Sequence, residues 1–163
     1  MRYVISAPPH IDVSAHVKKL ADAHGLTVLT DPSRKMCEQY GYQTLYEMPL
    51  ILQKQVRRRL ITDHTAALQG TDRLICDHGV LTWLADWMRW LWGETPAEEW
   101  EEVLADARPA IALYGSIHHV AQGPVAQYDG YRWLDKRNGV QIERLLRHLY
   151  SEFGCSERVQ YVG

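Results

Sequence analysis

Short runs of branched apolar residues alternate with helix-like stretches along the whole chain, and this alternation limits the fold more than any other feature. The expected strands are Arg2–Ser6, Leu26–Thr30, Arg73–Cys76, Ala110–Tyr114 and Arg158–Val162. Parallel strands are joined by long crossover connections, usually helices, so this order predicts a parallel sheet covered on both faces. We therefore expect a three-layer α/β/α fold with five parallel strands and the opening strand at the centre.

The segments between the expected strands carry helix signals. Asp12 or Ser14 can cap a helix that runs to His24, and Gly25 ends it. Further helices are expected after Ser33, at Leu45–Leu68, at Leu81–Trp92, at Pro96–Ala107 and within Trp133–Phe153. Gly115–Gly130 is expected to be a loop, because it is rich in glycine and contains a proline.

Composition excludes several classes of protein. The 163 residues are 46% apolar and 23% charged, which is typical of one globular domain spanning residues 1–163. The formal net charge of -2 does not indicate nucleic acid as a partner. No apolar run approaches the roughly 20 residues of a membrane span, so no membrane is expected. Three widely spaced cysteines without a C-x-x-C pair favour a reducing, cytoplasmic location.

In parallel α/β sheets, ligands bind beyond the carboxyl ends of the strands. The segments that follow the first four expected strands are Ser6–His10, Asp31–Arg34, Asp77–His78 and Tyr114–Ser116. We therefore look for binding and catalytic residues in these four segments.

The segment after the first strand stands where a phosphate-binding loop would lie. Such a loop reads GxxxxGK[ST], because glycines let backbone N–H groups converge on phosphates and the lysine adds positive charge. Residues 6–14 read SAPPHIDVS, with no glycine or lysine; Pro8 and Pro9 have no N–H group, and Asp12 would repel phosphate. The helix N-terminus can still attract an anion, so Pro9, His10 and Ser14 are candidate phosphate- or nucleotide-binding residues.

Two carboxylates follow the next strands. Asp31 could orient a hydroxyl group while Arg34 binds a phosphate, or Asp31 could cap the helix that follows, and both interpretations stay open. Asp77 could hold Mg²⁺ or its waters near a phosphate, and a helix cap is again the alternative. Asp31 and Asp77 are therefore candidate catalytic residues, and Asp77 is also the candidate metal ligand.

A segment late in the chain, Asp129–Arg137, places cations beside aromatic residues. A loop of this kind could close over phosphates with Arg132, Lys136 or Arg137. The alternative is a solvated turn with ordinary pairing between neighbouring side chains.

Other features favour structural roles. Trp83, Trp87 and Trp90 recur at helical spacing, which indicates a core stripe or a surface that faces a protein partner or a second copy. The adjacent pair His118–His119 lacks the spacing of metal ligands. The basic run Arg57–Arg59 is typical of a solvated helix face.

In their order and spacing, these segments resemble the small P-loop nucleoside/nucleotide kinase-like family, in particular its ribosylnicotinamide-kinase-like and phage deoxynucleotide-kinase-like members. The similarity covers nearly the whole chain. RYVIS and APPHIDVS stand at the family's first strand and phosphate loop. Asp31–Arg34 resembles its acid-and-arginine strand end, and Leu52–Val56 its glutamine-bearing helix. Asp77–His78, Asp129–Arg132 and Val159–Val162 are similar to the family's Asp-Arg strand end, D-G-x-R segment and closing strand.

The resemblance implies a P-loop kinase topology and roles for four residues. Asp31 would face the phosphate acceptor, Asp77 would serve magnesium, and Arg132 with Arg137 would belong to the lid. The chain departs from the family at the phosphate loop and at His78, where the family has arginine.

Three functions compete. The favoured one is a pseudo-kinase or weak nucleotide binder with a protein-interaction or regulatory role, because the loop has lost its phosphate-binding residues. The alternative is a divergent kinase, using Mg²⁺ and ATP, that phosphorylates a small acceptor with lid cations replacing the lysine. A Rossmann-type dinucleotide binder would need a G-x-G-x-x-G motif, which the chain lacks.

Overall fold

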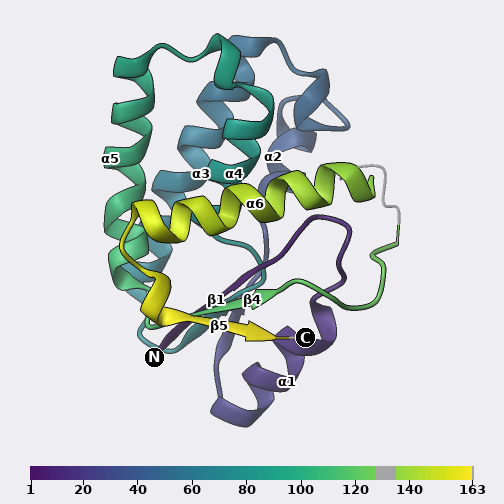
Figure 1. The fold of residues 1–163 in the computed structure, drawn as a ribbon, viewed down its shortest axis with the longest axis vertical. Coiled ribbons are helices and arrows are strands. Elements are labelled where there is room, and N and C mark those ends of the chain that lie inside the picture. The colour runs from purple at the N-terminus through teal and green to yellow at the C-terminus, as the bar shows by residue number, and fades with distance from the viewer. Residues whose placement is uncertain (128–134, 163) are drawn as a thin grey trace.

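A computed structural model gives the structure of the chain and describes residues 1–127 and 135–162. Its described residues form a five-stranded sheet in the order β2-β3-β1-β4-β5 (Figure 1). All four strand pairs are parallel. The strands are β1 (Arg2–Ser6), β2 (Thr27–Leu29), β3 (Leu74–Cys76), β4 (Ser116–Val120) and β5 (Val159–Val162). The expected parallel sheet with the opening strand in the middle is therefore confirmed.

Six α-helices in the described residues connect these strands. They are α1 (Ser14–His24), α2 (Ser33–Gln39), α3 (Leu50–Gly70), α4 (Val80–Trp90), α5 (Ala97–Leu113) and α6 (Lys136–Glu152). Three short 3-10 turns accompany them, η1 (Leu45–Glu47), η2 (Trp92–Glu94) and η3 (Ser156–Arg158). None of the described helices is both long enough and apolar enough to cross a membrane.

The helices form two unequal layers around the sheet. The larger apolar cluster joins one face of the sheet to α3, α4, α5 and α6, and the smaller one joins the opposite face to α1. Figure 1 shows α1 on the other side of the strands from these four helices. Alternate residues of a strand point to opposite faces, so Val4 enters the larger cluster and Ile5 the smaller one.

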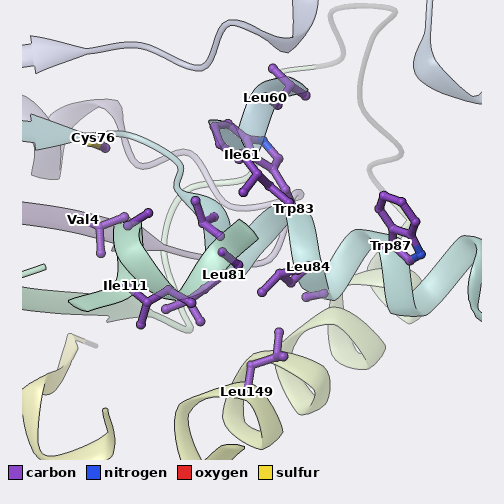
Figure 2. Packing of buried hydrophobic residues seen from close by; sticks show 14 of the residues in the cluster. Val4, Leu60, Ile61, Cys76, Leu81, Trp83, Leu84, Trp87, Ile111 and Leu149 are labelled. Atoms are coloured by element: carbon purple, nitrogen blue, oxygen red, sulfur yellow. The ribbon is translucent and has the colours of Figure 1, made fainter. Parts of the chain in front are cut away.

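The tryptophan stripe of α4 belongs to the core. Trp87 is fully buried and Trp83 is 5% exposed. Figure 2 shows Trp83 beside Ile61 of α3 and Leu84 directed toward Leu149 of α6. The Nε1–H of Trp87 donates a hydrogen bond to Thr95 Oγ1 at 2.9 Å, which satisfies its polar edge. The core interpretation of the stripe is confirmed, and Trp83 and Trp87 are not available to a partner chain.

Two expectations for the second half of the chain are wrong. Ala110–Tyr114 is not a strand, because α5 continues to Leu113 with Pro109 inside it. Ala110 and Ile111 extend the buried stripe of Val103 and Ala107 at helical spacing, so packing carries the helix past the proline.

The second error follows from the first. The fourth strand is Ser116–Val120, inside the expected loop. Its sequence SIHHV is mostly polar and therefore does not indicate a buried strand. His119 is fully buried because its Nδ1 pairs with the Tyr150 hydroxyl at 2.7 Å, and that hydroxyl donates to Ser6 Oγ at 2.8 Å. A tertiary hydrogen-bond chain therefore makes a polar strand suitable for the core.

Candidate functional site

The carboxyl ends of β1, β2 and β3 bring the loop after β1, Asp31 and Asp77 to one edge of the sheet. The expected fourth segment, Tyr114–Ser116, lies at the opposite edge. It precedes β4, and the Gly115 N–H donates to Arg2 O at the start of β1. This placement corrects the expectation for Tyr114–Ser116, because the fourth strand begins later in the chain.

Backbone N–H groups of the loop after β1 are already hydrogen-bonded inside the protein. The Ile11 N–H donates to Pro8 O at 3.0 Å, and the Asp12 N–H donates to Pro124 O at 2.8 Å. Ile11 also forms an antiparallel bridge with Val125. Pro8 and Pro9 have no N–H group to offer. These residues therefore do not present the free, convergent donors of a phosphate cradle.

A carboxylate already lies at the N-terminus of α1. Asp12 Oδ1 accepts the backbone N–H of Ser14 at 2.9 Å. The N-cap residue of α1 is Val13, with no side-chain capping bond, so the expectation that Asp12 or Ser14 is the cap is wrong. A negative charge at this point is stabilised by the helix dipole, which would otherwise attract an external anion. Asp12 thus occupies the interaction that a bound phosphate would use.

The His10 side chain fills a gap on α6. A Cβ atom added at Gly139 would overlap the His10 ring, so this close approach requires a glycine. The pKa of His10 is lowered by burial and by the charge of Lys136, while Glu143 acts in the opposite direction. The contact between His10 and Gly139 packs the loop after β1 against the first turn of α6, the helix that begins at Lys136.

A small inner cavity lies between this loop, α2, η1 and α4 and encloses about 60 Å³. Its lining residues are Pro9, Asp31, Ser33, Leu45, Tyr46, His78, Thr82, Trp83, Asp86 and Ile142. Candidate residues Pro9 and Asp31 thus meet at one site. The lining combines two carboxylates with two aromatic rings, which suits a polar ligand that carries a ring or a sugar.

Asp31 bonds the first residue of α2. Its Oδ1 accepts the Ser33 backbone N–H at 2.9 Å and also the Ser33 hydroxyl. The N-cap residue of α2 is Pro32, so the expectation that Asp31 is the helix cap is wrong. Asp31 also lines the inner cavity, so these bonds do not remove it from the site.

A buried ion pair lies at the inner cavity, which Asp86 lines, and the sequence did not predict it. Arg57 is 1% exposed, and its Nε and Nη2 donate to Asp86 Oδ2 at 3.1 and 2.7 Å. The Tyr46 hydroxyl donates to Asp86 Oδ1 at 2.8 Å. The interpretation of Arg57–Arg59 as a solvated face is thus wrong for Arg57. The available signal was Asp86 itself, a charge in the middle of the apolar sequence of α4.

Three polar atoms around the inner cavity have no hydrogen-bond partner within the described residues. They are His78 Nδ1, Thr82 Oγ1 and Trp83 Nε1. Buried polar atoms are normally paired, and such exceptions indicate water or a ligand. Because an indole N–H can only donate, a ligand here would present an acceptor to Trp83.

A second, larger hollow lies between α1, β2 and β3 and measures about 600 Å³. We call it the α1 groove; its lining includes Asp12, Ser14, Lys18, Asp77 and His78. Asp31 and Asp77 therefore line different spaces. Since His78 borders both spaces, the inner cavity and the α1 groove are neighbours.

The remaining candidate cations are spread over the surface. Arg34 is half exposed on α2, where it pairs with Glu38 at 3.9 Å, and it lines neither space. Lys136 and Arg137 are exposed at the start of α6, where the Arg137 N–H donates to Asp135 Oδ1. Arg132 lies outside the described residues.

No group of three or more His, Cys, Asp or Glu side chains within the described residues could hold a metal ion. Magnesium usually binds through one or two carboxylates together with substrate phosphates, so Asp77 would be its ligand only with a nucleotide in place. The three thiols are buried, and burial raises the pKa of Cys37 to about 11 and of Cys76 to about 12. These two thiols are therefore not nucleophiles at neutral pH.

Comparisons with known proteins identify the family. A family model described as an AAA domain matches residues 14–159. The chain belongs to this AAA domain family. The match begins at Ser14, so it rests on the chain after the phosphate loop. None of the curated proteins matches this AAA domain family member.

Two solved structures share the fold of this AAA domain family member. NadR in complex with NAD and AMP-PNP matches 99% of the chain with a TM-score of 0.71 and 13% identity. NadR in complex with NR matches 98% with a TM-score of 0.69 and 14% identity. The chain spans 44% and 43% of the two NadR chains, less than half of each. The expected P-loop NTPase kinase-like fold is thereby confirmed.

Proposed function

We propose that this AAA domain family member is a pseudo-kinase that binds a small ligand in the inner cavity without using ATP. The observation that carries the proposal is that the N–H groups of Ile11, Asp12 and Ser14 are already bonded within the chain. A phosphate loop acts by aiming free backbone donors at the β- and γ-phosphates. A loop whose donors are engaged, and which has no lysine, cannot do so.

The size of the loss can be estimated from the missing contacts. Hydrogen bonds to charged groups each contribute about 1.5–3 kcal/mol. A tenfold change in affinity corresponds to about 1.4 kcal/mol. Losing two or three such contacts therefore weakens a micromolar ATP site to millimolar or beyond.

The inner cavity favours an unphosphorylated ligand. Asp31 and Asp86 line it, and its lining among the described residues includes no lysine or arginine, so a phosphate group would be repelled. Arg57 offsets part of this charge through its ion pair with Asp86. Its volume of about 60 Å³ is well below the roughly 300–1,000 Å³ of sites for drug-sized ligands. We therefore propose that a single ring or sugar of a nucleoside enters it, with an acceptor atom directed at Trp83. NR, which NadR binds, is the first probe.

A protein that binds a ligand but catalyses no reaction would act through its ligand-bound form. We propose a regulatory role, in which the liganded chain is recognised by a protein partner or a second copy. The regulatory role depends on ligand binding, so its test follows the binding experiments.

A divergent kinase is the second candidate, and one observation favours it. Lys136 begins α6, whose Gly139 packs against His10, and its charge lowers the pKa of His10, so this cation could replace the missing lysine. Asp77 and Ser14, which border the same groove, would then hold Mg²⁺ together with ATP phosphates.

Calorimetric titration tests the two candidates directly. We expect MgATP and MgGTP to bind the wild-type protein no more tightly than millimolar, and NR to bind more tightly than either. The variant Asp31→Ala should weaken NR binding by about tenfold or more, because it removes a charged partner. Asp63→Ala, an exposed aspartate of α3, is the matched control and should bind like the wild type.

Micromolar MgATP binding, with phosphate transfer abolished by Asp77→Ala, would instead establish the divergent kinase. Tight binding of NR 5′-phosphate in preference to NR would contradict the charge argument for the inner cavity.

A further inference from the structure

Two histidines from distant parts of the sequence meet on the α1 side of the sheet. His16 lies in the first turn of α1 and His118 lies in the middle of β4. His16 Nε2 and His118 Nδ1 are 3.2 Å apart, and the ring centroids are 5.3 Å apart. Neither residue lines the inner cavity or the α1 groove, so the pair is independent of the site described above.

The surroundings hold one of these rings in place and leave the other accessible. His118 is 6% exposed, and the Tyr3 ring packs edge-on against it with centroids 5.4 Å apart. His16 is half buried, so its side of the pair is open to solvent. The pair thus combines the buried ring of His118 with the more accessible ring of His16.

We propose that His16 and His118 form a two-histidine binding site for a divalent transition-metal ion of the Zn²⁺, Ni²⁺ and Cu²⁺ class. Neutral imidazole is a preferred ligand of these ions. Two nitrogens that each lie about 2.0–2.1 Å from a tetrahedral ion are about 3.3 Å apart. The observed separation matches that spacing, so an ion beside the line between the two nitrogens could bind both, once the proton of their hydrogen bond has moved to the other nitrogen of its ring.

The protonation states of both rings suit this role. Burial lowers the pKa of His16 and of His118, and the charge of Lys19 or of neighbouring histidines lowers them further. Both rings are therefore neutral at pH 7, so no imidazolium proton has to be released to solvent before an ion binds.

Other features keep the site weak and selective. His118 Nε2 has no hydrogen-bond partner within the described residues, and metal binding at Nδ1 places an N–H at that buried position. No third ligand of the usual types is assembled there among the described residues, so water completes the coordination. We expect micromolar affinity for Zn²⁺, and none for Mg²⁺, which prefers oxygen ligands.

A bound ion would link α1 to β4 across the smaller apolar cluster. Because the unfolded chain does not hold the two rings together, the ion stabilises the folded state, and this stabilisation grows with the logarithm of its concentration above the Kd. The site would thus act as a metal-dependent clamp on the helix that follows the phosphate loop.

Calorimetry on untagged protein tests the proposal with ZnCl₂, NiCl₂ and MgCl₂ in a non-coordinating buffer at neutral pH. We expect one Zn²⁺ per chain with micromolar affinity, and at least about tenfold weaker binding in His16→Ala, because a lost ligand costs no less than a lost outer-shell partner. His148→Ala, an exposed histidine of α6, is the matched control and should bind like the wild type.

A second measurement avoids mutating the buried histidine. In NMR spectra, substoichiometric Ni²⁺ should broaden the imidazole signals of His16 and His118 before those of other histidines. Equal Zn²⁺ affinity in His16→Ala and wild type would overturn the proposal, as would first broadening elsewhere. Either outcome would leave the two rings as a simple hydrogen-bonded pair.

Discussion

At the scale of single residues, charge inside the protein is held by specific partners. Arg57 is almost fully buried, and both its Nε and Nη2 bond Asp86. The Arg57 Nη1 also donates to Gln53 Oε1 at 3.2 Å. A buried charge is tolerated only when it is paired in this way, so the removal of either partner leaves the other exposed to an apolar environment.

The first prediction concerns this ion pair. Asp86→Ala should lower the free energy of unfolding by about 3–5 kcal/mol, because it leaves the Arg57 charge without its partner. The double variant Arg57→Met with Asp86→Ala should regain much of that loss. Urea denaturation of the wild type, the single variant and the double variant measures both effects. A double variant no more stable than Asp86→Ala would show that the loss comes from packing and not from charge.

The second prediction concerns the contact between His10 and Gly139. Gly139→Ala should destabilise the wild-type protein by about 1–3 kcal/mol, because the added methyl group overlaps the His10 ring. In a His10→Ala background the same change should instead stabilise the protein by up to about 1 kcal/mol, because alanine favours helix over glycine. Thermal or urea denaturation of the wild type, the two single variants and the double variant gives the sign of the stability change caused by Gly139→Ala. The same sign with and without the His10 side chain would disprove the contact.

At the scale of elements, the N-terminus of α1 carries its own anion. Asp12 lies at that end, and it bonds the Ser14 N–H. The third prediction follows: Asp12→Ala should cost about 1 kcal/mol of stability through loss of this hydrogen bond. The same variant should bind inorganic phosphate or sulfate more tightly than the wild type, since it frees an N–H and removes a repelling charge.

Asp12→Asn separates these two effects. The asparagine side chain can still accept the Ser14 N–H, so its stability should stay close to that of the wild type. Its phosphate affinity should lie between those of the wild type and Asp12→Ala. Calorimetry with phosphate at low ionic strength checks the order, and unchanged affinity across the series would mean that Asp12 does not exclude anions.

At the scale of the whole molecule, buried histidines link stability to pH. His64 on α3 and the neighbours His118 and His119 on β4 are buried, and burial is the largest cause of the lowered pKa of each. The pKa of His64 falls from 6.5 to about 4, and its Nε2 bonds the Tyr114 hydroxyl at 2.9 Å. The unfolded chain therefore binds protons on these side chains at a higher pH than the folded chain does.

The fourth prediction is a loss of stability in mild acid. The contribution of His64 should be complete above pH 6.5 and should disappear as the pH falls toward 4. For a shift from 6.5 to about 4, this single residue accounts for up to about 3 kcal/mol. Urea denaturation at several pH values between 4 and 7 gives the free energy of unfolding at each pH. This free energy should depend less steeply on pH in His64→Gln than in the wild type. An equal pH dependence in the two proteins would assign the acid sensitivity to other groups.

Some properties of this protein follow from the sequence by itself. The alternation of apolar runs with helical stretches was enough to predict the parallel sheet with β1 in its centre, because periodicity and turn signals are local. The absence of glycine and lysine from residues 6–14 is also visible without a structure. The start of α1 close to Asp12 could be predicted for the same reason, although the N-cap residue is Val13.

Only the tertiary structure decided the rest, because it depends on partners far away in the chain. Ala110–Leu113 has the apolar composition of a strand, yet the stripe it shares with Val103 and Ala107 places it in α5. SIHHV forms β4 because Tyr150 pairs with a histidine that would otherwise be costly to bury. Likewise Arg57 is buried only because Asp86 pairs with it from another helix. Local pattern determines which segments can form an element, whereas burial and polar partners determine which of them do.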